Sequence, residues 1–225
     1  MRVVKRLLAL ATVFLLITGV ITACGTKKTE LSEEELIKML QKPTVMITVG
    51  SSHASGVIVR SDGSGVVIAS VTHLMEGFEQ GIIRFSDGHA GFADVVYCDK
   101  STDVTLLKIK RSDMDEAFAD SLEAVAIDEE AYRALEVDDT MYVVGSAVST
   151  AANVMKGKFK AFDYYVPEFD QYLLYLYCDV FAGMSGSGVY TDSGFFCGLV
   201  AGGSDEGETV VIPLTDILDS LEKIN

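Results

Sequence analysis

The sequence predicts an all-β protein in two strand-rich halves, and three observations support this. Short apolar or alternating runs between residues 44 and 110, and again between 140 and 213, have the period of β-strands. Turn sequences such as SDGSG and SDGHAG separate these runs, and their Asp-Gly pairs favour hairpins. The stretch between residues 111 and 140 is acidic and alanine-rich, so we interpret it as a linker. Strands at such short spacing form a β-barrel or a β-sandwich.

Each end of this strand-rich region carries a predicted helix. Residues 31–43, LSEEELIKMLQKP, combine a capping box of Ser32 and Glu35 with an apolar stripe, and Pro43 ends the helix. Residues 213–225, PLTDILDSLEKIN, have the pattern of a second amphipathic helix. We therefore expect an all-β domain with a short N-terminal and a C-terminal helix.

The first residues have the pattern of an export signal. Arg2, Lys5 and Arg6 precede an apolar run from Leu7 to Ala23, as in a secretory signal peptide. The alternative is a permanent transmembrane helix, although the run is at the short limit for crossing a bilayer.

The segment ITAC at the end of this run resembles the lipobox of bacterial lipoproteins. The resemblance implies residues 1–23 as a signal peptide and a lipid on Cys24, with residues 24–43 as tether and helix. The domain at 44–225 is then expected to be extracytoplasmic, on the bacterial cell membrane through its lipid anchor.

The charge of the chain limits its partners. The formal net charge is −15, and a nucleic-acid partner is disfavoured because phosphate binding needs a basic surface. Cationic peptides would be attracted, although the charge also has a simpler explanation in solubility.

The three histidines restrict how a serine could be activated. His53, His73 and His89 all precede Ser185, which lies in the glycine-rich segment VFAGMSGSGVY. A nucleophile elbow needs Gly-x-Ser-x-Gly and a later histidine, so that arrangement is excluded for Ser185. The histidines also lack metal-ligand spacing, which is against a metal site. We expect no organic cofactor either.

The order His, Asp, Ser remains open. His73 follows a predicted strand, Asp103 precedes another strand 30 residues later, and Ser185 lies in the glycine-rich turn. Serine is a weak nucleophile until a histidine takes its proton, and an aspartate orients that histidine. A subtilisin-type order using Asp62 and His73 is the alternative, but the strand-rich sequence is against it.

Several ordered segments resemble the trypsin/chymotrypsin-like serine proteases, most closely the HtrA/DegP branch. The matching segments are SGVIVRSDGSGVVIASVTHLMEG, TDVTLLKIK, LEVDDTMYVVGSA and GMSGSGVYTDSGFFCGLVAGG. The resemblance extends over about residues 36–225. It implies two six-stranded antiparallel β-barrels of the chymotrypsin-like fold, at about 44–112 and 138–225, joined by a linker at about 113–137.

The same resemblance implies a serine endopeptidase that cuts peptide bonds in a protein or peptide substrate through an acyl-enzyme. His73, Asp103 and Ser185 would be catalytic, and the backbone N–H groups of Gly183 and Ser185 would form the oxyanion hole. Asp179 is either a pocket acid for Lys or Arg or a structural residue. The substrate would pair as an added strand with residues 198–202, namely Gly198, Leu199, Val200, Ala201 and Gly202.

The nucleophile segment departs from the family pattern. Met184 stands where Asn or Asp is frequent, Ser187 replaces the second glycine and Gly188 replaces the proline. These changes motivate an alternative function, a catalytically inactive, protease-like binding protein on the cell surface. Cys178 and Cys197 flank the same turn and would be either a disulfide or two buried thiols.

Overall fold

The computed structural model describes residues 31–146 and 152–224, and Glu33 and the residues after it form one compact unit. The predicted signal peptide and Cys24 lie outside the described residues. Within the described part, no helix is both long and apolar enough to cross a bilayer.

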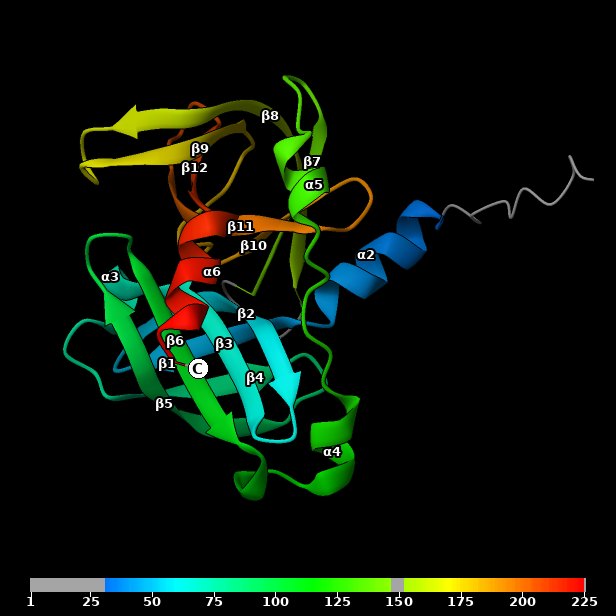
Figure 1. Ribbon diagram of the computed structural model, residues 1–225, viewed down its shortest axis with the longest axis vertical. Helices are drawn as coiled ribbons and strands as arrows, with labels where there is room; N and C mark the ends of the chain where they lie inside the picture. The colour runs from blue at the N-terminus through cyan, green and yellow to red at the C-terminus, as the bar shows by residue number, and fades with distance from the viewer. Residues whose placement is uncertain (1–30, 147–151, 225) are drawn as a thin grey trace, which may run out of the picture. The chain divides into compact units, whose positions relative to one another are not determined.

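The unit contains two closed antiparallel barrels of six strands each, which confirms the expected fold (Figure 1). In the first barrel the strand order is β1-β2-β3-β6-β5-β4, and β1 closes the barrel by pairing with β4. Its strands are β1 (Thr44–Val49), β2 (Ser52–Asp62), β3 (Gly65–Val71), β4 (Gln80–Phe85), β5 (Ala90–Asp99) and β6 (Val104–Lys110).

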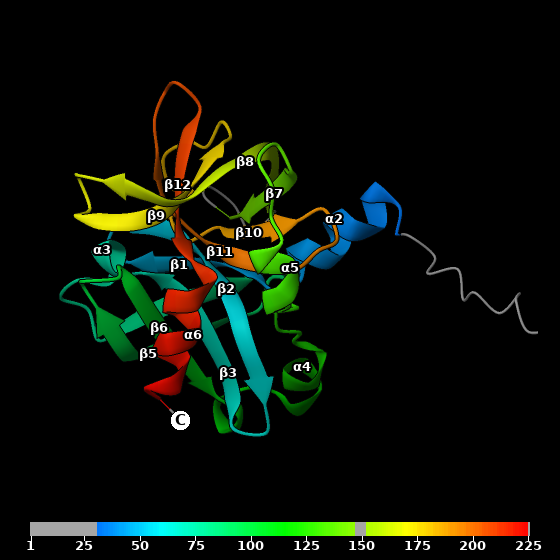
Figure 2. The ribbon, with the colours of Figure 1, turned by 45° about the horizontal axis from the view of Figure 1, so that its top comes forward.

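The second barrel repeats this design with the order β10-β11-β12-β9-β8-β7, closed by β10 against β7. Its long hairpin of β8 and β9 is drawn in yellow at the left of Figure 2. The strands are β7 (Thr140–Gly145), β8 (Asn153–Val166), β9 (Gln171–Tyr177), β10 (Gly188–Thr191), β11 (Phe196–Gly203) and β12 (Glu208–Pro213).

Helices connect and flank the barrels. The predicted terminal helices are α2 (Glu33–Gln41) and α6 (Leu214–Glu222), and α6 contacts β6 of the first barrel as well as β11. The acidic linker forms a 3₁₀ turn (Arg111–Asp113) and two short helices, α4 (Glu116–Ser121) and α5 (Glu129–Arg133). Asp115 and Asp128 cap these two helices by accepting backbone N–H groups, which explains part of the acidic composition.

Strand β3 shows how the barrels share a core. All seven of its residues are buried, because Val66 and Ile68 face the interior of the first barrel. Val67, Ala69 and Val71 belong instead to the larger core that includes the second barrel. A strand covered on both faces reads as a continuous apolar run. The end of β3 is therefore fixed at the junction of the barrels, where His73 follows.

Candidate active site

His73 and Asp103 are brought together by the pairing of β3 with β6. Val71 is the register partner of Val104, so the residues just beyond this end of the ladder come from the 72–75 and 99–103 segments. His73 lies on the single-turn helix α3 (Thr72–Met75). The Thr72 side chain is buried and bonds Thr105 Oγ1 at 2.9 Å, which fixes the start of α3 against β6.

The Asp103 carboxylate holds the His73 ring through two hydrogen bonds. Oδ1 accepts the backbone N–H of His73 at 2.9 Å, and Oδ2 lies 2.8 Å from Nδ1. Asp103 is only 7% exposed and has a φ of +56°, a conformation that Asp adopts more readily than most residues. The carboxylate favours a proton on Nδ1, which leaves the lone pair of Nε2 available to accept another.

The Ser185 backbone lies against the first barrel. Its carbonyl accepts the N–H of Ser55 on β2 at 2.9 Å. The neighbouring Gly186 has a φ of +79°, and a Cβ on it would lie 2.1 Å from the Ser55 carbonyl oxygen, so only glycine fits. The Ser185 hydroxyl donates to the Ala201 carbonyl at 3.4 Å. Within the described residues, no hydrogen bond joins Ser185 to His73.

The turn before Ser185 presents two backbone donors. The N–H of Met184 bonds the Phe181 carbonyl at 3.0 Å, and Gly183 has a φ of +91°, as the third residue of a type II turn requires. The N–H groups of Gly183 and Ser185 have no hydrogen-bond acceptor among the residues that the structure describes. These are the two donors predicted for an oxyanion hole.

A buried network of serines ties this turn to both barrels. Ser187 Oγ bonds Ser55 Oγ at 3.1 Å, and Ser55 Oγ accepts the N–H of Ser146 at 2.9 Å. Ser70 Oγ donates to the Ser55 carbonyl at 2.8 Å. A Cβ on Gly145 would lie 1.8 Å from Ser187 Oγ, so Ser187 fills the space that the glycine leaves. From the sequence, Ser187 could be identified only as a replacement of the family's second glycine. No sequence pattern pointed to Ser55.

The predicted substrate strand is shorter than expected. Gly198 and Leu199 pair with β10 on one side and β12 on the other, and are buried. Val200 has no free backbone group either. Its N–H donates to the Ser187 carbonyl, its carbonyl accepts the N–H of Gly186, and it is the register partner of Val211 on β12. These three residues therefore cannot receive a peptide strand. On the side away from β12, the edge from Ala201 through Gly202 to Gly203 pairs with no described strand.

The structure decides between the two alternatives for the cysteine pair and places Asp179. Cys178 and Cys197 are free, buried thiols and not a disulfide. Cys178 contacts Gly157 of β8, whereas the Cys197 thiol lies 3.5 Å from the Phe195 carbonyl, so the two side chains have different neighbours. Asp179 is exposed, and its Oδ1 lies 2.9 Å from where a Cβ on Gly207 would be.

The structure also decides against the subtilisin-type order. Asp62 lies at the tip of the β2–β3 hairpin, where its Oδ1 accepts the N–H of Ser64. His73 follows the opposite end of β3, and a strand of this length spans about 20 Å. In the described part of the chain, no three His, Cys, Asp or Glu side chains are grouped as metal ligands would be.

Comparisons with known proteins agree with this architecture. The family model described as a trypsin-like peptidase domain matches residues 54–199. A serine endoprotease from Yersinia pestis is similar in structure, with a TM-score of 0.70 and 22% identity, over 86% of this chain and 66% of that protein. The HtrA-type protease AlgW, solved with a tripeptide, gives a TM-score of 0.73 and 20% identity over 86% of this chain and 64% of its own.

The chain thus spans slightly less than two thirds of the length of these structural relatives. No protein of curated function matches it in sequence. The family model nevertheless extends over more than half of the chain and includes His73, Asp103 and Ser185. This chain belongs to the trypsin-like peptidase family.

Proposed function

We propose that the protein is a serine endopeptidase that cleaves peptide bonds through an acyl-enzyme on Ser185. The observation that carries this proposal is the buried Asp103 carboxylate bonded to both the backbone N–H and Nδ1 of His73. Such a carboxylate selects the tautomer in which Nε2 accepts a proton, and it stabilises the imidazolium that forms.

The proton then follows a defined path. Nε2 of His73 takes the proton of the Ser185 hydroxyl as Oγ attacks the carbonyl carbon of the substrate. The negative charge that develops on the carbonyl oxygen is stabilised by the N–H groups of Gly183 and Ser185. His73 next gives the proton to the leaving amine, and water releases the acyl group by the same steps in reverse order.

The bond from Ser185 to Ala201 is compatible with this path. At 3.4 Å it is longer than an ordinary O–H···O hydrogen bond. A hydroxyl held so weakly exchanges partners by rotation about χ1, and catalytic hydrogen bonds often tighten only when substrate binds.

A second candidate function is suggested by the partner of Ser185, which in the described residues is Ala201 and not His73. A protein in which Ser185 stays bonded to Ala201 would bind peptides at the β11 edge without cleaving them, as a protease-like binding protein. The two candidates share the fold and differ in whether Ser185 reacts.

We further propose that the domain acts outside the cytoplasm, attached through a lipid on Cys24. The proposal is supported by the charged and then apolar segment before ITAC. Metabolic labelling with a radioactive fatty acid should mark the wild type and not Cys24→Ala. Equal labelling of both would contradict the anchor.

Proteolysis of an unfolded protein tests the enzymatic proposal. We expect the full chain to cut reduced, carboxymethylated casein, with the new termini identified by mass spectrometry. Ser185→Ala should leave the casein intact while its circular dichroism spectrum matches the wild type. A chelator should leave the wild-type rate unchanged. Intact casein with folded wild type would instead favour the binding protein.

A further inference from the structure

A cleft of about 510 Å³ lies on the second barrel beside the free edge of β11. At that edge it is lined by Gly202, Gly203 and Ser204. The other lining residues come mainly from the end of β8, the turn that follows it and β9, the hairpin drawn in yellow in Figures 1 and 2. The cleft therefore adjoins the place where a bound peptide would pair with β11.

The pairing register tells which substrate residue would reach the cleft. The contact of Ser185 Oγ with the Ala201 carbonyl marks the reacting end of the edge. In an antiparallel pairing, the substrate residue opposite Gly203 precedes the residue opposite Ala201 by two positions. A side chain two or three residues before the attacked carbonyl is thus the one that lies beside Gly203 and Ser204.

The lining combines aromatic faces with carboxylates. The rings of Tyr164 and Tyr175 are stacked, with centroids 4.8 Å apart and planes at 24°. Glu208 is held at the cleft because its two carboxylate oxygens accept from Tyr175 at 3.4 Å and Ser204 at 3.2 Å. Glu168 lines the same cleft and is exposed. Aromatic faces beside carboxylates attract a long side chain with an apolar stem and a cationic head.

No Lys or Arg among the described residues forms an ion pair with the carboxylates of this cleft, although the charge of Lys160 acts on Tyr175. Glu168 and Glu208 form no ion pair with Lys or Arg in the part of the chain that the structure describes, and neither do Asp205 and Glu206 on the adjoining turn. Lys160, on the same hairpin, is paired with Asp138 at 2.5 Å. The uncompensated charge therefore favours a cation supplied from outside.

We propose that this cleft binds a lysine or arginine of the substrate, two or three residues before the residue whose carbonyl Ser185 attacks. The proposal rests on the proposed peptidase function and names its substrate class as basic peptide segments. The stem of the side chain lies along Tyr164 and Tyr175, and its charged group lies between Glu168 and Glu208.

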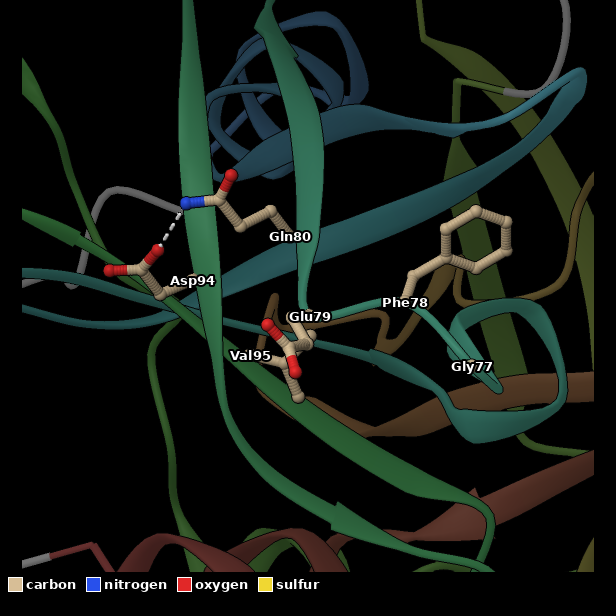
Figure 3. A pocket seen from close by; sticks show the side chains of 6 residues that line it. All are labelled: Gly77, Phe78, Glu79, Gln80, Asp94 and Val95. Atoms are coloured by element: carbon tan, nitrogen blue, oxygen red, sulfur yellow. Dashed lines mark hydrogen bonds between the residues drawn. The ribbon is translucent and has the colours of Figure 1, made fainter.

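Another hollow, of about 760 Å³ on the first barrel, serves as the contrast (Figure 3). It also carries carboxylates, Glu79 and Asp94, but Asp94 already accepts a hydrogen bond from Gln80 at 2.7 Å. None of its lining residues belongs to the β11 edge. Glu79→Gln therefore supplies a control that removes one carboxylate from an acidic hollow away from the β11 edge.

Binding to the full-length Ser185→Ala chain tests the cleft without requiring catalysis. The probes are pairs of fluorescent decapeptides. The two peptides of a pair differ only at one position, which is arginine in one and its uncharged isostere citrulline in the other, and each pair tests a different position. We expect arginine at one position to lower Kd about fivefold relative to citrulline. The difference should vanish when Glu168→Gln and Glu208→Gln are added together, persist with Glu79→Gln, and shrink at high salt.

Cleavage of the same peptides by the wild type places that position relative to the cut. A preference two or three residues before the attacked carbonyl supports the proposal. Equal affinities for arginine and citrulline everywhere, a preference that survives the double substitution, or one at another distance would overturn it. Cleavage without any preference would count against the cleft alone. A preference in Ser185→Ala with no wild-type cleavage would support the cleft and count against the peptidase.

Discussion

The chain contains two Asp–His pairs with almost the same hydrogen bonds and very different surroundings. Asp103 accepts the backbone N–H of His73 at 2.9 Å and contacts Nδ1 at 2.8 Å. Asp87 accepts the backbone N–H of His89 at 3.0 Å and contacts Nδ1 at 2.9 Å. The Asp103 side chain is 9% exposed, whereas that of Asp87 is 48% exposed. The bonding pattern alone therefore does not identify an active site.

The origin of each pair explains the difference. Asp87 and His89 are two residues apart in a surface turn, where a local Asx bond is common. Asp103 and His73 are 30 residues apart and meet only because β3 pairs with β6 in a closed barrel. The His73 pair also lies at the barrel junction to which the Ser185 turn is bonded, whereas His89 stacks on Phe118 of the linker.

Replacing each aspartate by asparagine should give the largest difference in peptidase activity between the two Asp–His pairs. Asp103→Asn keeps the size of the side chain and tolerates the positive φ, but its amide cannot enforce the required His73 tautomer. We expect kcat/KM for peptide hydrolysis to fall roughly 10,000-fold. Asp87→Asn should change it less than about twofold, since surface substitutions have small effects. Equal losses in the two variants would refute the distinction.

Removing the serine network should test how the Ser185 turn is held against the first barrel. Ser55→Ala deprives the buried Ser146 N–H of its acceptor and Ser187 of its partner. The free energy of unfolding should fall by about 1–3 kcal/mol. Ser52→Ala, at the exposed start of the same strand, is the control and should change it by less than about 0.5 kcal/mol. Urea denaturation measures both, and a Ser55→Ala protein as stable as the control would contradict this role.

The cysteines show the same contrast between buried and exposed groups, and we expect it to affect their reactivity with a thiol reagent. Burial raises the pKa of Cys178 to about 11 and that of Cys197 to about 12, from an ordinary value near 9. Cys98 is exposed. At pH 8, iodoacetamide should therefore modify Cys98 in the native protein before the two buried thiols, as judged by mass spectrometry of the peptides. Fast modification of Cys178 or Cys197 in the folded protein would contradict their burial.

The raised thiol pKa values also fix the direction of a stability change at alkaline pH. Native Cys178 and Cys197 keep their protons above pH 9, where the unfolded chain loses them. Their contribution to stability is therefore complete below pH 9 and declines as the pH rises toward 11 or 12. Serine in place of both cysteines should flatten this part of the curve of unfolding free energy against pH.

Much of this architecture could be predicted from the sequence because it depends on local patterns. Alternating runs and Asp-Gly turns predicted the strands, and the acidic stretch predicted the linker. The order of His73, Asp103 and Ser185 predicted the candidate catalytic residues. His73 and Asp103 flank β3 and β6, which pair with each other. The terminal helices followed from a capping box and an amphipathic pattern.

The remaining features depend on contacts that no local pattern encodes. Ser55 and Ser187 are 132 residues apart and meet only across the barrels. Strand β10 covers Gly198 and Leu199, which limits the free edge to Ala201 and the two residues after it. Register shifts in β8 bring Tyr164 over Tyr175, and Glu208 reaches the same cleft from β12. None of these positions has a sequence signature.

Covalent labelling of the folded full-length chain with a fluorophosphonate tests whether Ser185 is an activated nucleophile, because the reagent reacts with such a serine. We expect a single adduct, found by mass spectrometry on the peptide that contains Ser185. We expect no adduct in Ser185→Ala, much slower labelling in Asp103→Asn, and an unchanged rate in Asp87→Asn. An unlabelled but folded wild type, or an adduct on another residue, would contradict this expectation.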